Sequence, residues 1–294
     1  MAAPSTHRAA IAYPKPVLSI VMPAYNEERR LPASLARLDR YVRGLDREVE
    51  VIVVENGSGD GTAAVVEECR QRMPYLRLLR VAVAGKGLAV RTGMLAARGD
   101  HLMFCDVDFS MPLEEIGRFL ALLDAGAPIV IASRELATSQ RHHEPVRRHV
   151  MGRIFNRVVQ VLIVHGIADT QCGFKAFQRP VGRDLFSLQR IRGWGFDVEL
   201  LYLARRRGYR VQQLAIDWYY DADSRVRGLS DALSMLGEIL RIRLYALLGF
   251  YRRRLPPTSD YRPSMGSIAT GGASGADPGA SGDGVHGRFA APQS

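Results

Sequence analysis

The sequence predicts an α/β fold in which helices flank a mainly parallel sheet. From residue 17 onwards, short runs of β-branched residues alternate with longer segments of helical periodicity, which is the rhythm of βαβ units. The chain has 294 residues, of which 47% are hydrophobic and 24% charged, so it can bury a sizeable core. This composition excludes a mostly disordered chain, a collagen-like repeat and a disulfide-stapled miniprotein.

Each element of the first half is expected from its own residue pattern. The apolar run VLSIVM at residues 17–22 is typical of a buried strand, and Leu31, Leu35 and Leu38 have the spacing of an amphipathic helix over residues 27–42. The further strands are expected over residues 49–54, 76–81, 101–105 and 128–132, and the further helices over residues 62–72, 87–97 and 112–123. Because ligands of such sheets bind at the carboxyl ends of the strands, the loops there are where we expect the chemistry.

Beyond residue 140 the elements become longer and more basic. We expect helices over residues 141–165, 197–207 and 229–254, a short strand or loop over 171–177 and a strand over 210–218. The Gly-, Ser-, Ala- and Pro-rich stretch after these elements predicts a solvated tail. The predicted organisation is a flexible N-terminus over residues 1–16, one domain over 17–254 and a disordered tail over 255–294.

The charge balance limits the classes of partner. Lysine and arginine number 40 against 30 aspartates and glutamates, a formal net charge of +10 that favours nucleic acid, anionic membranes or phosphorylated substrates. No helix-turn-helix, zinc-finger spacing or RNP-type motif is visible, which argues against nucleic acid. The three cysteines are scattered, no signal-type apolar stretch begins the chain and no apolar run reaches roughly 18 residues. We therefore expect a reducing, cytosolic compartment and no membrane-spanning helix.

The loops after the first two strands are polar and acidic. By itself, PAYNEE at residues 23–28 is interpreted as a turn in which Asn26 caps the next helix. In ENGSGDGT at residues 55–62 the glycines permit a tight turn, while Glu55 and Asn56 at the strand end could hold a ribose or a base. The glycine spacing does not match the dinucleotide-binding fingerprint.

Two carboxylates follow the fourth expected strand. Asp106 and Asp108 are separated by one residue in CDVD, and both can reach one hard divalent cation if the backbone turns there. Mg²⁺ and Mn²⁺ take oxygen ligands and share their remaining positions with a diphosphate. A solvated acidic turn is the alternative for an isolated D-x-D. The position of this D-V-D directly after the buried run HLMFC favours the metal site.

Taken together, these loops resemble a known family. VLSIVMPAYNEE, VIVVENGSGDGT, GKGLAVRTGM, LMFCDVDFS and IASRE, in this order, are similar to the GT-A fold of family 2 glycosyltransferases. DTQCGFK at residues 169–175 and WGFDVELL at 194–201 resemble the branch that makes polyprenyl-phosphate sugars, and within it the dolichyl-phosphate β-glucosyltransferases most. The resemblance covers residues 17–251, and DTQCGFK is its most specific motif.

The resemblance implies that residues 17–135 form the half of the domain that binds the nucleotide sugar. For that binding it implies Pro23, Ala24, Tyr25, Glu27, Glu55, Asn56, Lys86, Arg91 and Asp106. Asp106 and Asp108 would hold Mg²⁺ or Mn²⁺ on the diphosphate. Relatives usually carry paired aspartates where this chain has Glu55 and Asn56, so this chain keeps one of the two carboxylates.

The resemblance also implies an acceptor half over residues 136–254. The family places an arginine near the phosphates where this chain has Arg134, and Ser224-Arg225 stands where relatives often have Ser-Lys. Arg153, on the first basic helix, is a further candidate contact for the acceptor phosphate. The expected catalytic residues are Arg134, Asp108, Asp169 and Asp197. Asp169 and Asp197 would orient the sugar or assist proton movement; capping or salt bridges within the fold are the alternative.

The acceptor that the resemblance implies needs little general acid–base catalysis. A polyprenyl phosphate is already an anion at neutral pH, so its oxygen can attack an anomeric carbon once arginines and a divalent cation shield the charges. The expected reaction is an in-line displacement with inversion, in which a UDP-sugar gives its hexose, expected to be glucose, to the lipid phosphate. Alternatives are UDP-N-acetylhexosamine or GDP-mannose as donor, a soluble or polysaccharide acceptor, or a non-catalytic binding module of the same fold.

The two long basic helices suit a lipid acceptor. Apolar residues follow helical spacing on each, at Met151, Ile154, Phe155, Val158, Val159 and Leu162 and at Leu229, Leu233, Leu236, Leu240, Leu244 and Leu247. Arginines border both stripes, the pattern of a helix that lies in a membrane interface. Packing of the stripes on the sheet is the alternative, and both can hold along different parts of one helix. We expect a peripheral protein on the cytoplasmic face of a membrane.

Overall fold

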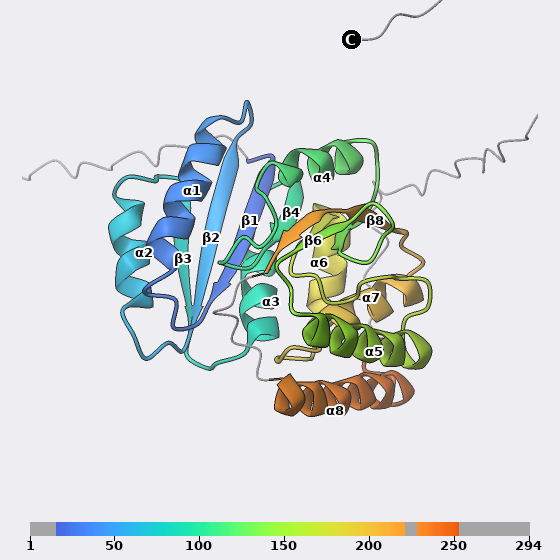
Figure 1. Cartoon of the computed structure of the whole chain (residues 1–294). Coiled ribbons are helices and arrows are strands. Elements are labelled where there is room, and N and C mark those ends of the chain that lie inside the picture. Colours follow the sequence, from blue (N-terminus) through green and yellow to red (C-terminus); the bar gives the residue numbers. More distant parts are fainter. Residues whose placement is uncertain (1–15, 221–227, 253–294) are drawn as a thin grey trace, which may run out of the picture. The chain divides into compact units, whose positions relative to one another are not determined.

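A seven-stranded sheet lies at the centre of the fold. The computed structural model describes residues 16–220 and 228–252, without the side chains of residues 147, 148 and 228–233. The strands are β1 (Leu18–Ala24), β2 (Val49–Asn56), β3 (Leu76–Val81), β4 (His101–Phe104), β5 (Ile129–Ser133), β7 (Lys175–Gln178) and β8 (Val211–Ala215). Their order in the sheet is β3-β2-β1-β4-β7-β5-β8 (Figure 1). All neighbouring pairs are parallel except the two that involve β7, which confirms the mainly parallel sheet.

β7 is the one reversed strand. It pairs antiparallel with β4, where Phe104 lies opposite Lys175, and antiparallel with β5, where Ile131 lies opposite the same residue. Because β7 runs in reverse, its first residue lies at the edge where the parallel strands end. The segment before it, residues 171–174, therefore reaches the carboxyl ends of β4 and β5.

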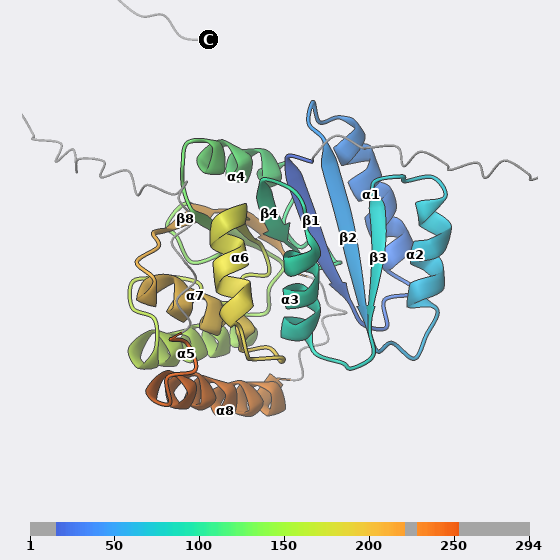
Figure 2. The same ribbon diagram turned by 180° about the vertical axis from the view of Figure 1, so that it is seen from behind.

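Helices cover both faces of the sheet (Figures 1 and 2). One face carries α1 (Leu31–Arg43), α2 (Thr62–Arg70) and α4 (Glu115–Asp124), and the other carries α3 (Lys86–Ala96), α6 (Arg179–Leu188) and α7 (Phe196–Arg206). The strands supply apolar side chains to both layers alternately, since Val51 and Val53 pack on the first set of helices and Ile52 and Val54 on the second. This is why the strands read as continuous apolar runs rather than as alternating patterns.

Two long helices lie side by side at one end of the second layer. They are α5 (Val146–Leu162) and α8 (Gly228–Leu247), and both figures show them next to each other (Figures 1 and 2). Each buries only part of its apolar surface: Val159 on α5 and Ile239 and Ile242 on α8 enter the core. Arg243 Nε on α8 donates to the carbonyl oxygen of Leu162 at 2.9 Å, which joins the two helices. None of the described helices is long and apolar enough to cross a membrane.

Several elements differ from those expected from the sequence. α1 begins at Leu31 rather than at residue 27, and Asn26 does not cap it: with φ of 53°, Asn26 turns away and its Oδ1 accepts a hydrogen bond from Gly59 N at 2.7 Å. Prediction of Asn26 as a helix cap was therefore wrong. Pro32 stands in the first turn instead, where a missing N–H costs nothing.

The second half contains elements that the sequence did not predict. Helix α6 follows β7 without a loop, and the strand expected over 210–218 is divided into β8 and β9 (Asp217–Tyr219). β9 pairs in parallel with β6 (Gln140–His142) in a separate two-stranded sheet. Because residues 140–142 are a strand, the basic helix expected from residue 141 begins at Val146. The described residues all belong to one compact unit.

Candidate active site

The candidate site is built around the turn that follows β4. Asp106 and Asp108 lie here, and Phe109 takes a φ of +44°, which turns the chain sharply after them. Ser110 N donates to Asp108 Oδ1 at 3.1 Å and fixes that carboxylate. Burial, and next the negative charge of Asp106, raise the pKa of Asp108 above its usual value. The two carboxylates therefore act on each other electrostatically.

A divalent cation fits this carboxylate pair. Hard oxygen ligands that repel each other are stabilised by a shared cation, and Mg²⁺ in particular is commonly bound through one or two carboxylates plus substrate phosphates. In residues 16–220 and 228–252, no group of three or more His, Cys, Asp or Glu side chains could hold a metal ion. The donor set thus suits a cation that takes its remaining oxygens from a ligand such as a diphosphate.

Lys86 faces the carboxylate pair from the start of α3. Its Nζ lies 2.6 Å from Asp106 Oδ1 and 5.0 Å from the centre of the Trp194 ring. Burial would lower the pKa of Lys86, but the carboxylates of Asp106 and Asp197 outweigh it and raise that pKa. Lys86 therefore remains an ammonium ion beside the site. A cation fixed in this place can bind a phosphate oxygen.

Glycines let Lys86 come this close to the neighbouring loop. A Cβ on Gly85 would lie 2.8 Å from the carbonyl oxygen of Arg192, and one on Gly87 would lie 2.7 Å from Phe196 Cβ. Neither position tolerates a side chain unless the backbone moves. Gly173 also permits a close approach, because a Cβ on this residue would clash with the Asp106 carboxylate. GKG and DTQCGFK are thus close-packing motifs that meet at Asp106.

Asp169 is a buried carboxylate that forms an ion pair with the partly buried Arg134. Arg134 donates to it through Nε (2.7 Å), Nη2 (3.0 Å) and its backbone N (3.0 Å), and the guanidinium lies 5.3 Å from the centre of the Trp218 ring. Burial alone would raise the pKa of Asp169, yet Arg134 holds it well below its usual value. A carboxylate stabilised in this way is a poor proton acceptor. The salt-bridging alternative for Asp169 is therefore present in the structure.

Asp197 is also paired with a buried cation. Lys175 Nζ lies 2.7 Å from Asp197 Oδ1 and donates to the carbonyl oxygen of Cys172 at 2.7 Å. Both side chains are buried, with the Lys175 ammonium 5.6 Å from the centre of the Phe104 ring. Burial raises the pKa of Asp197, although Lys175 acts in the opposite direction. This pair fixes the start of α7 to the start of β7.

The residues of the first two loops bind to each other. Glu27 accepts two hydrogen bonds of 2.8 Å from the Arg30 guanidinium, and its backbone N donates to Thr62 Oγ1 at 2.8 Å. Glu55 accepts from Ser58 N at 2.5 Å within its own turn. These contacts shape the rim of the site. They leave the nucleotide contacts predicted for Glu27 and Glu55 as predictions.

The ends of β1 and β2 are joined to α3 by an amide. With its side chain oriented to satisfy both neighbours, buried Asn56 donates to the carbonyl oxygen of Ala24 at 2.7 Å and accepts from Gly85 N at 3.1 Å. Pro23 and Ala24 form the last residues of β1, and Tyr25 beyond them is 43% exposed. Tyr25 is thus the member of this group with the most surface open to a ligand.

Other predicted residues lie away from the carboxylate pair or outside the described residues. Arg91 Nε donates to the carbonyl oxygen of Phe186 at 3.0 Å and so joins α3 to α6. Arg153 on α5 is 67% exposed, with Nε 3.9 Å from Glu135 Oε2. Ser224 and Arg225 lie outside the described residues.

Three residues of this region were not assigned from the sequence. Trp194 lies over Lys86, Lys175 pairs with Asp197, and Glu238 on α8 accepts a hydrogen bond from Gly195 N at 2.6 Å. Trp194 and Lys175 stand within the motifs WGFD and DTQCGFK, so the motifs pointed to them. No local pattern marked Glu238, because its partner lies in a different element.

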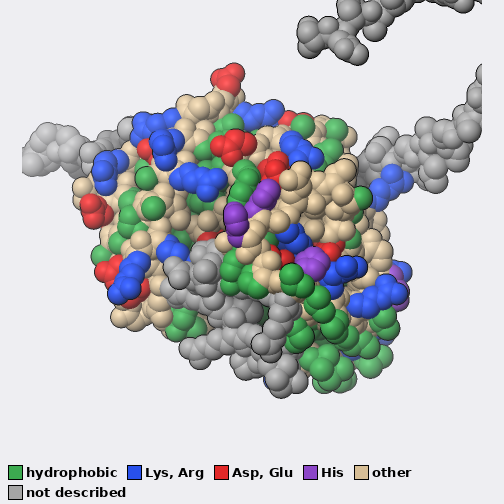
Figure 3. All heavy atoms as spheres, in the orientation of Figure 1, with side chains coloured by type: hydrophobic (Ala, Val, Ile, Leu, Met, Phe, Trp, Pro, Cys, Tyr) green, Lys and Arg blue, Asp and Glu red, His purple; other side chains and the backbone are tan. Residues whose placement is uncertain are grey.

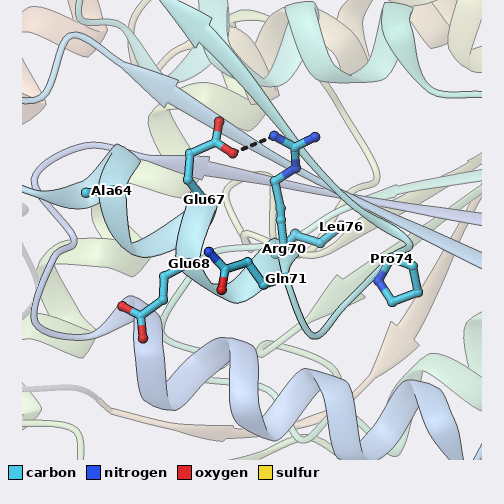
Figure 4. Close-up of a pocket in the computed structure, with 7 residues that line it drawn as sticks. All are labelled: Ala64, Glu67, Glu68, Arg70, Gln71, Pro74 and Leu76. Carbon is cyan, nitrogen blue, oxygen red and sulfur yellow. Dashed lines mark hydrogen bonds and ion pairs between the residues drawn. The ribbon is translucent and has the colours of Figure 1, made fainter.

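Two hollows on the surface of the described part of the chain lie away from this site. One of about 650 Å³ is lined by α2 and the start of β3, including Glu67, Arg70 and Leu76 (Figure 4). This hollow lies at the amino end of β3, whereas the candidate site lies at the carboxyl ends of the parallel strands. A second of about 380 Å³ lies where α5 and α7 end, and there Arg205 and Arg243 donate to main-chain carbonyl oxygens. Both are explained by local packing and helix termination.

The chain is similar to known glycosyltransferases. Residues 19–186 match the family model "Glycosyl transferase family 2". Dolichyl-phosphate beta-glucosyltransferase of Dictyostelium discoideum is 32% identical over 249 residues, which cover 80% of this chain and 76% of the relative. The Homo sapiens protein of the same name is 31% identical over 254 residues, which cover 81% and 78%.

A solved structure supports the fold. Glucosyl-3-phosphoglycerate synthase from Mycobacterium tuberculosis, in complex with Mn²⁺, UDP and phosphoglyceric acid, has a TM-score of 0.57 at 21% identity and covers 84% of this chain and 85% of its own. This likeness confirms the predicted GT-A fold, and the matches confirm the resemblance seen in the loops. The chain belongs to glycosyltransferase family 2.

Proposed function

We propose that the protein transfers glucose from UDP-glucose to the phosphate of a dolichyl-type polyprenyl phosphate, with inversion at the anomeric carbon. The observation that carries this proposal is the meeting of three motifs at one place: the D-V-D turn, the GKG lysine and DTQCGFK, with Gly173 against Asp106 and Lys86 at 2.6 Å from it. Two relatives that match about 80% of this chain are named for glucosyl transfer to dolichyl phosphate.

The donor side uses the charges around Asp106. Asp106 and Asp108 would hold Mn²⁺ or Mg²⁺, and the cation would supply positive charge beside the diphosphate of the donor. Lys86 adds a fixed ammonium on the same side, because the carboxylates of Asp106 and Asp197 outweigh the effect of burial and keep it protonated. The rim residues Tyr25 and Glu27 are proposed to contact the nucleotide.

The acceptor side needs no free general base. A phosphate oxygen of the lipid forms the new bond to the anomeric carbon while the bond to the UDP oxygen breaks, and the attacking oxygen carries no proton to remove. This agrees with Asp169 and Asp197, which are both buried and paired with cations rather than exposed as bases. Their proposed contribution is to fix Arg134 and the start of α7. Arg153 is proposed as an outer contact for the acceptor phosphate.

The lipid would be reached through α5 and α8. On α5, Met151, Ile154 and Val158 are 50%, 57% and 39% exposed, and on α8, Leu240 and Leu244 are 59% and 50% exposed. Figure 3 shows hydrophobic side chains gathered over this part of the molecule, next to Lys and Arg. Apolar faces with basic borders favour an anionic membrane surface. We propose a peripheral protein on the cytoplasmic face, where its three unpaired cysteines stay reduced.

A donor panel tests the proposal. Purified protein is mixed with Mn²⁺ or Mg²⁺, polyprenyl phosphate in vesicles and, separately, UDP-glucose, UDP-N-acetylglucosamine and GDP-mannose. We expect a lipid-linked hexose from UDP-glucose and a product that mild acid hydrolyses to free glucose. A higher rate with either other donor would change the donor assignment. No lipid-linked product from any donor would overturn the proposed function.

A further inference from the structure

One side chain of α8 reaches the loop that carries Trp194. Glu238 Oε2 accepts a hydrogen bond from Gly195 N at 2.6 Å. A Cβ on Gly195 would lie 2.9 Å from the same oxygen, and one on Gly193 would clash with the Glu238 carboxylate. The glycines on both sides of Trp194 therefore admit the carboxylate against the backbone.

This contact fixes two groups at once. Gly195 is the residue before the first turn of α7, so the negative carboxylate also lies at the positive end of the α7 dipole. Between the two glycines, Trp194 projects over Lys86, with Nζ 5.0 Å from the ring centre. Lys86 in turn lies 2.6 Å from Asp106 Oδ1. Three successive contacts thus join α8 to the carboxylate pair.

We propose that Glu238 is a positioning residue, which holds the Gly193–Gly195 turn so that Trp194 covers Lys86 and keeps it directed at Asp106. The surface of α8 that carries Leu240 and Leu244 is exposed and apolar, whereas Glu238 faces the site loop. One helix therefore serves both the proposed lipid surface and the donor side. The kinetic consequence rests on the proposed function; the effect on Trp194 does not.

Fluorescence tests the position of Trp194 directly. The chain has two tryptophans, so the Trp218→Phe background leaves Trp194 as the only reporter. In that background Glu238→Ala removes the acceptor, and Glu238→Asp withdraws it by one CH₂ while keeping the charge. We expect both to shift the Trp194 emission to longer wavelength and to raise quenching by acrylamide about twofold, because the turn loses its only carboxylate contact among the described residues.

Matched variants separate positioning from general damage. Glu238→Gln keeps an acceptor oxygen and is expected to leave the emission unchanged. Arg241 is exposed and lies about one turn after Glu238 on α8. Arg241→Ala changes the charge by one unit and is also expected to leave the Trp194 emission unchanged. Unaltered emission in both Glu238→Ala and Glu238→Asp, or an equal shift in Arg241→Ala, would overturn the proposal.

Kinetics in the full chain with both tryptophans supply the second measurement. We expect Glu238→Ala to lower kcat/KM for UDP-glucose about tenfold, Glu238→Gln to restore it to within about threefold, and the KM for polyprenyl phosphate to stay unchanged. If Glu238→Ala raised only the KM for polyprenyl phosphate and left kcat/KM for UDP-glucose unchanged, a donor-side role would be contradicted. If the unaltered protein transfers no glucose, the proposed function fails, and the fluorescence result still decides the role of Glu238.

Discussion

At the scale of single residues, the site contains two kinds of carboxylate. Asp169 and Asp197 are each paired with a cation at 2.7 Å. Asp106 is paired with Lys86 at 2.6 Å, and its negative charge helps to raise the pKa of Asp108, which has no such cation of its own among the described ion pairs. A paired carboxylate stabilises the fold, whereas two repelling carboxylates cost stability unless a cation joins them. Substitutions of the two kinds should therefore separate activity from stability.

The first prediction concerns Asp108. Asp108→Asn should lower glucosyl transfer by at least about 100-fold, because it removes one of the two charges proposed to hold the cation on the diphosphate. Its thermal midpoint should not fall, since burial beside Asp106 already disfavours the ionised form. Transfer assays and Mn²⁺ titration check this. The exposed Asp46→Asn is the charge-matched control, and turnover within about threefold of the parent would refute the assignment.

The second prediction concerns Asp169 and acid. Its folded-state pKa lies below the unfolded value of 3.8, so its stabilising effect is fully present above about pH 4 and is lost as pH falls towards the folded pKa. Asp169→Asn should therefore lower the free energy of unfolding at pH 7 by about 3 kcal/mol, because Arg134, whose side chain is only 21% exposed, loses the partner of its charge.

In urea titrations at several pH values, the parent should lose stability steeply below pH 4 and Asp169→Asn more gently. Asp46→Asn serves here as the exposed control. An acid limb of equal slope in parent and variant would contradict the role of the Arg134 pair.

The roles of many single residues could not be predicted from the sequence. The D-V-D turn was identified from its place after a buried strand. The partners of the buried polar side chains could not be identified in this way. Arg134 pairs with Asp169, Lys175 pairs with Asp197 and Gly85 bonds to Asn56. These are tertiary contacts, which no local spacing of residues encodes.

At the scale of elements, the apolar stripes of α5 and α8 divide between core and surface. Val159 and Ile239 are fully buried, while Ile154 and Leu244, a few residues away, are 57% and 50% exposed. Exposed apolar surface of this extent is typical of an interaction site. Packing of the stripes into the core is thus confirmed on one part of each helix, and membrane contact of the exposed part stays a prediction.

The third prediction tests the exposed part. Ile154→Glu and Leu244→Glu should each weaken binding to anionic vesicles about tenfold, because each places a negative charge where apolar surface would enter the interface. Thermal midpoints should stay within about 2 °C, since neither side chain is in the core. Vesicle sedimentation measures the binding. Gln71→Glu, at the exposed residue directly after α2, adds the same charge as a control, and equal weakening there would contradict the prediction.

Local sequence patterns predicted most helices and strands. They failed where pairing with distant strands determines the element. The first five strands and their helices follow from apolar runs and helical spacing, with boundaries that moved by a few residues. Helix α6 was missed although Pro180 and the spacing of Val181, Leu185 and Leu188 are helical signals, because it follows β7 with no turn between them. The division into β8 and β9 depends on pairing with β5 and β6, which lie far away in the chain.

At the scale of the whole molecule, the two predicted halves share one sheet. Within it β5, in the first half, pairs with β7 and β8 of the second half and not with β4. The sheet therefore becomes continuous only when both halves are present. The notion of a separate nucleotide-sugar half over residues 17–135 stays a prediction about function, not about independent folding.

The fourth prediction follows from this pairing. A fragment ending at residue 135 should not unfold cooperatively in urea, because it leaves one edge of β4 unpaired and β5 without a neighbour. A chain ending at residue 252 retains all seven strands and should show a single transition. Circular dichroism during urea titration compares the two. A cooperative transition in the shorter fragment would show that its strands form a different sheet.

The reversal of β7 also has a consequence during synthesis. The D-V-D turn leaves the ribosome well before β7, and the long helix α5 is made between them. Until β7 inserts beside β4, Gly173 cannot pack on Asp106 and the carboxylate pair has no wall on that side. A nascent chain therefore carries the site's acidic turn but not the finished site, and the enzyme is assembled only after most of its length has been translated.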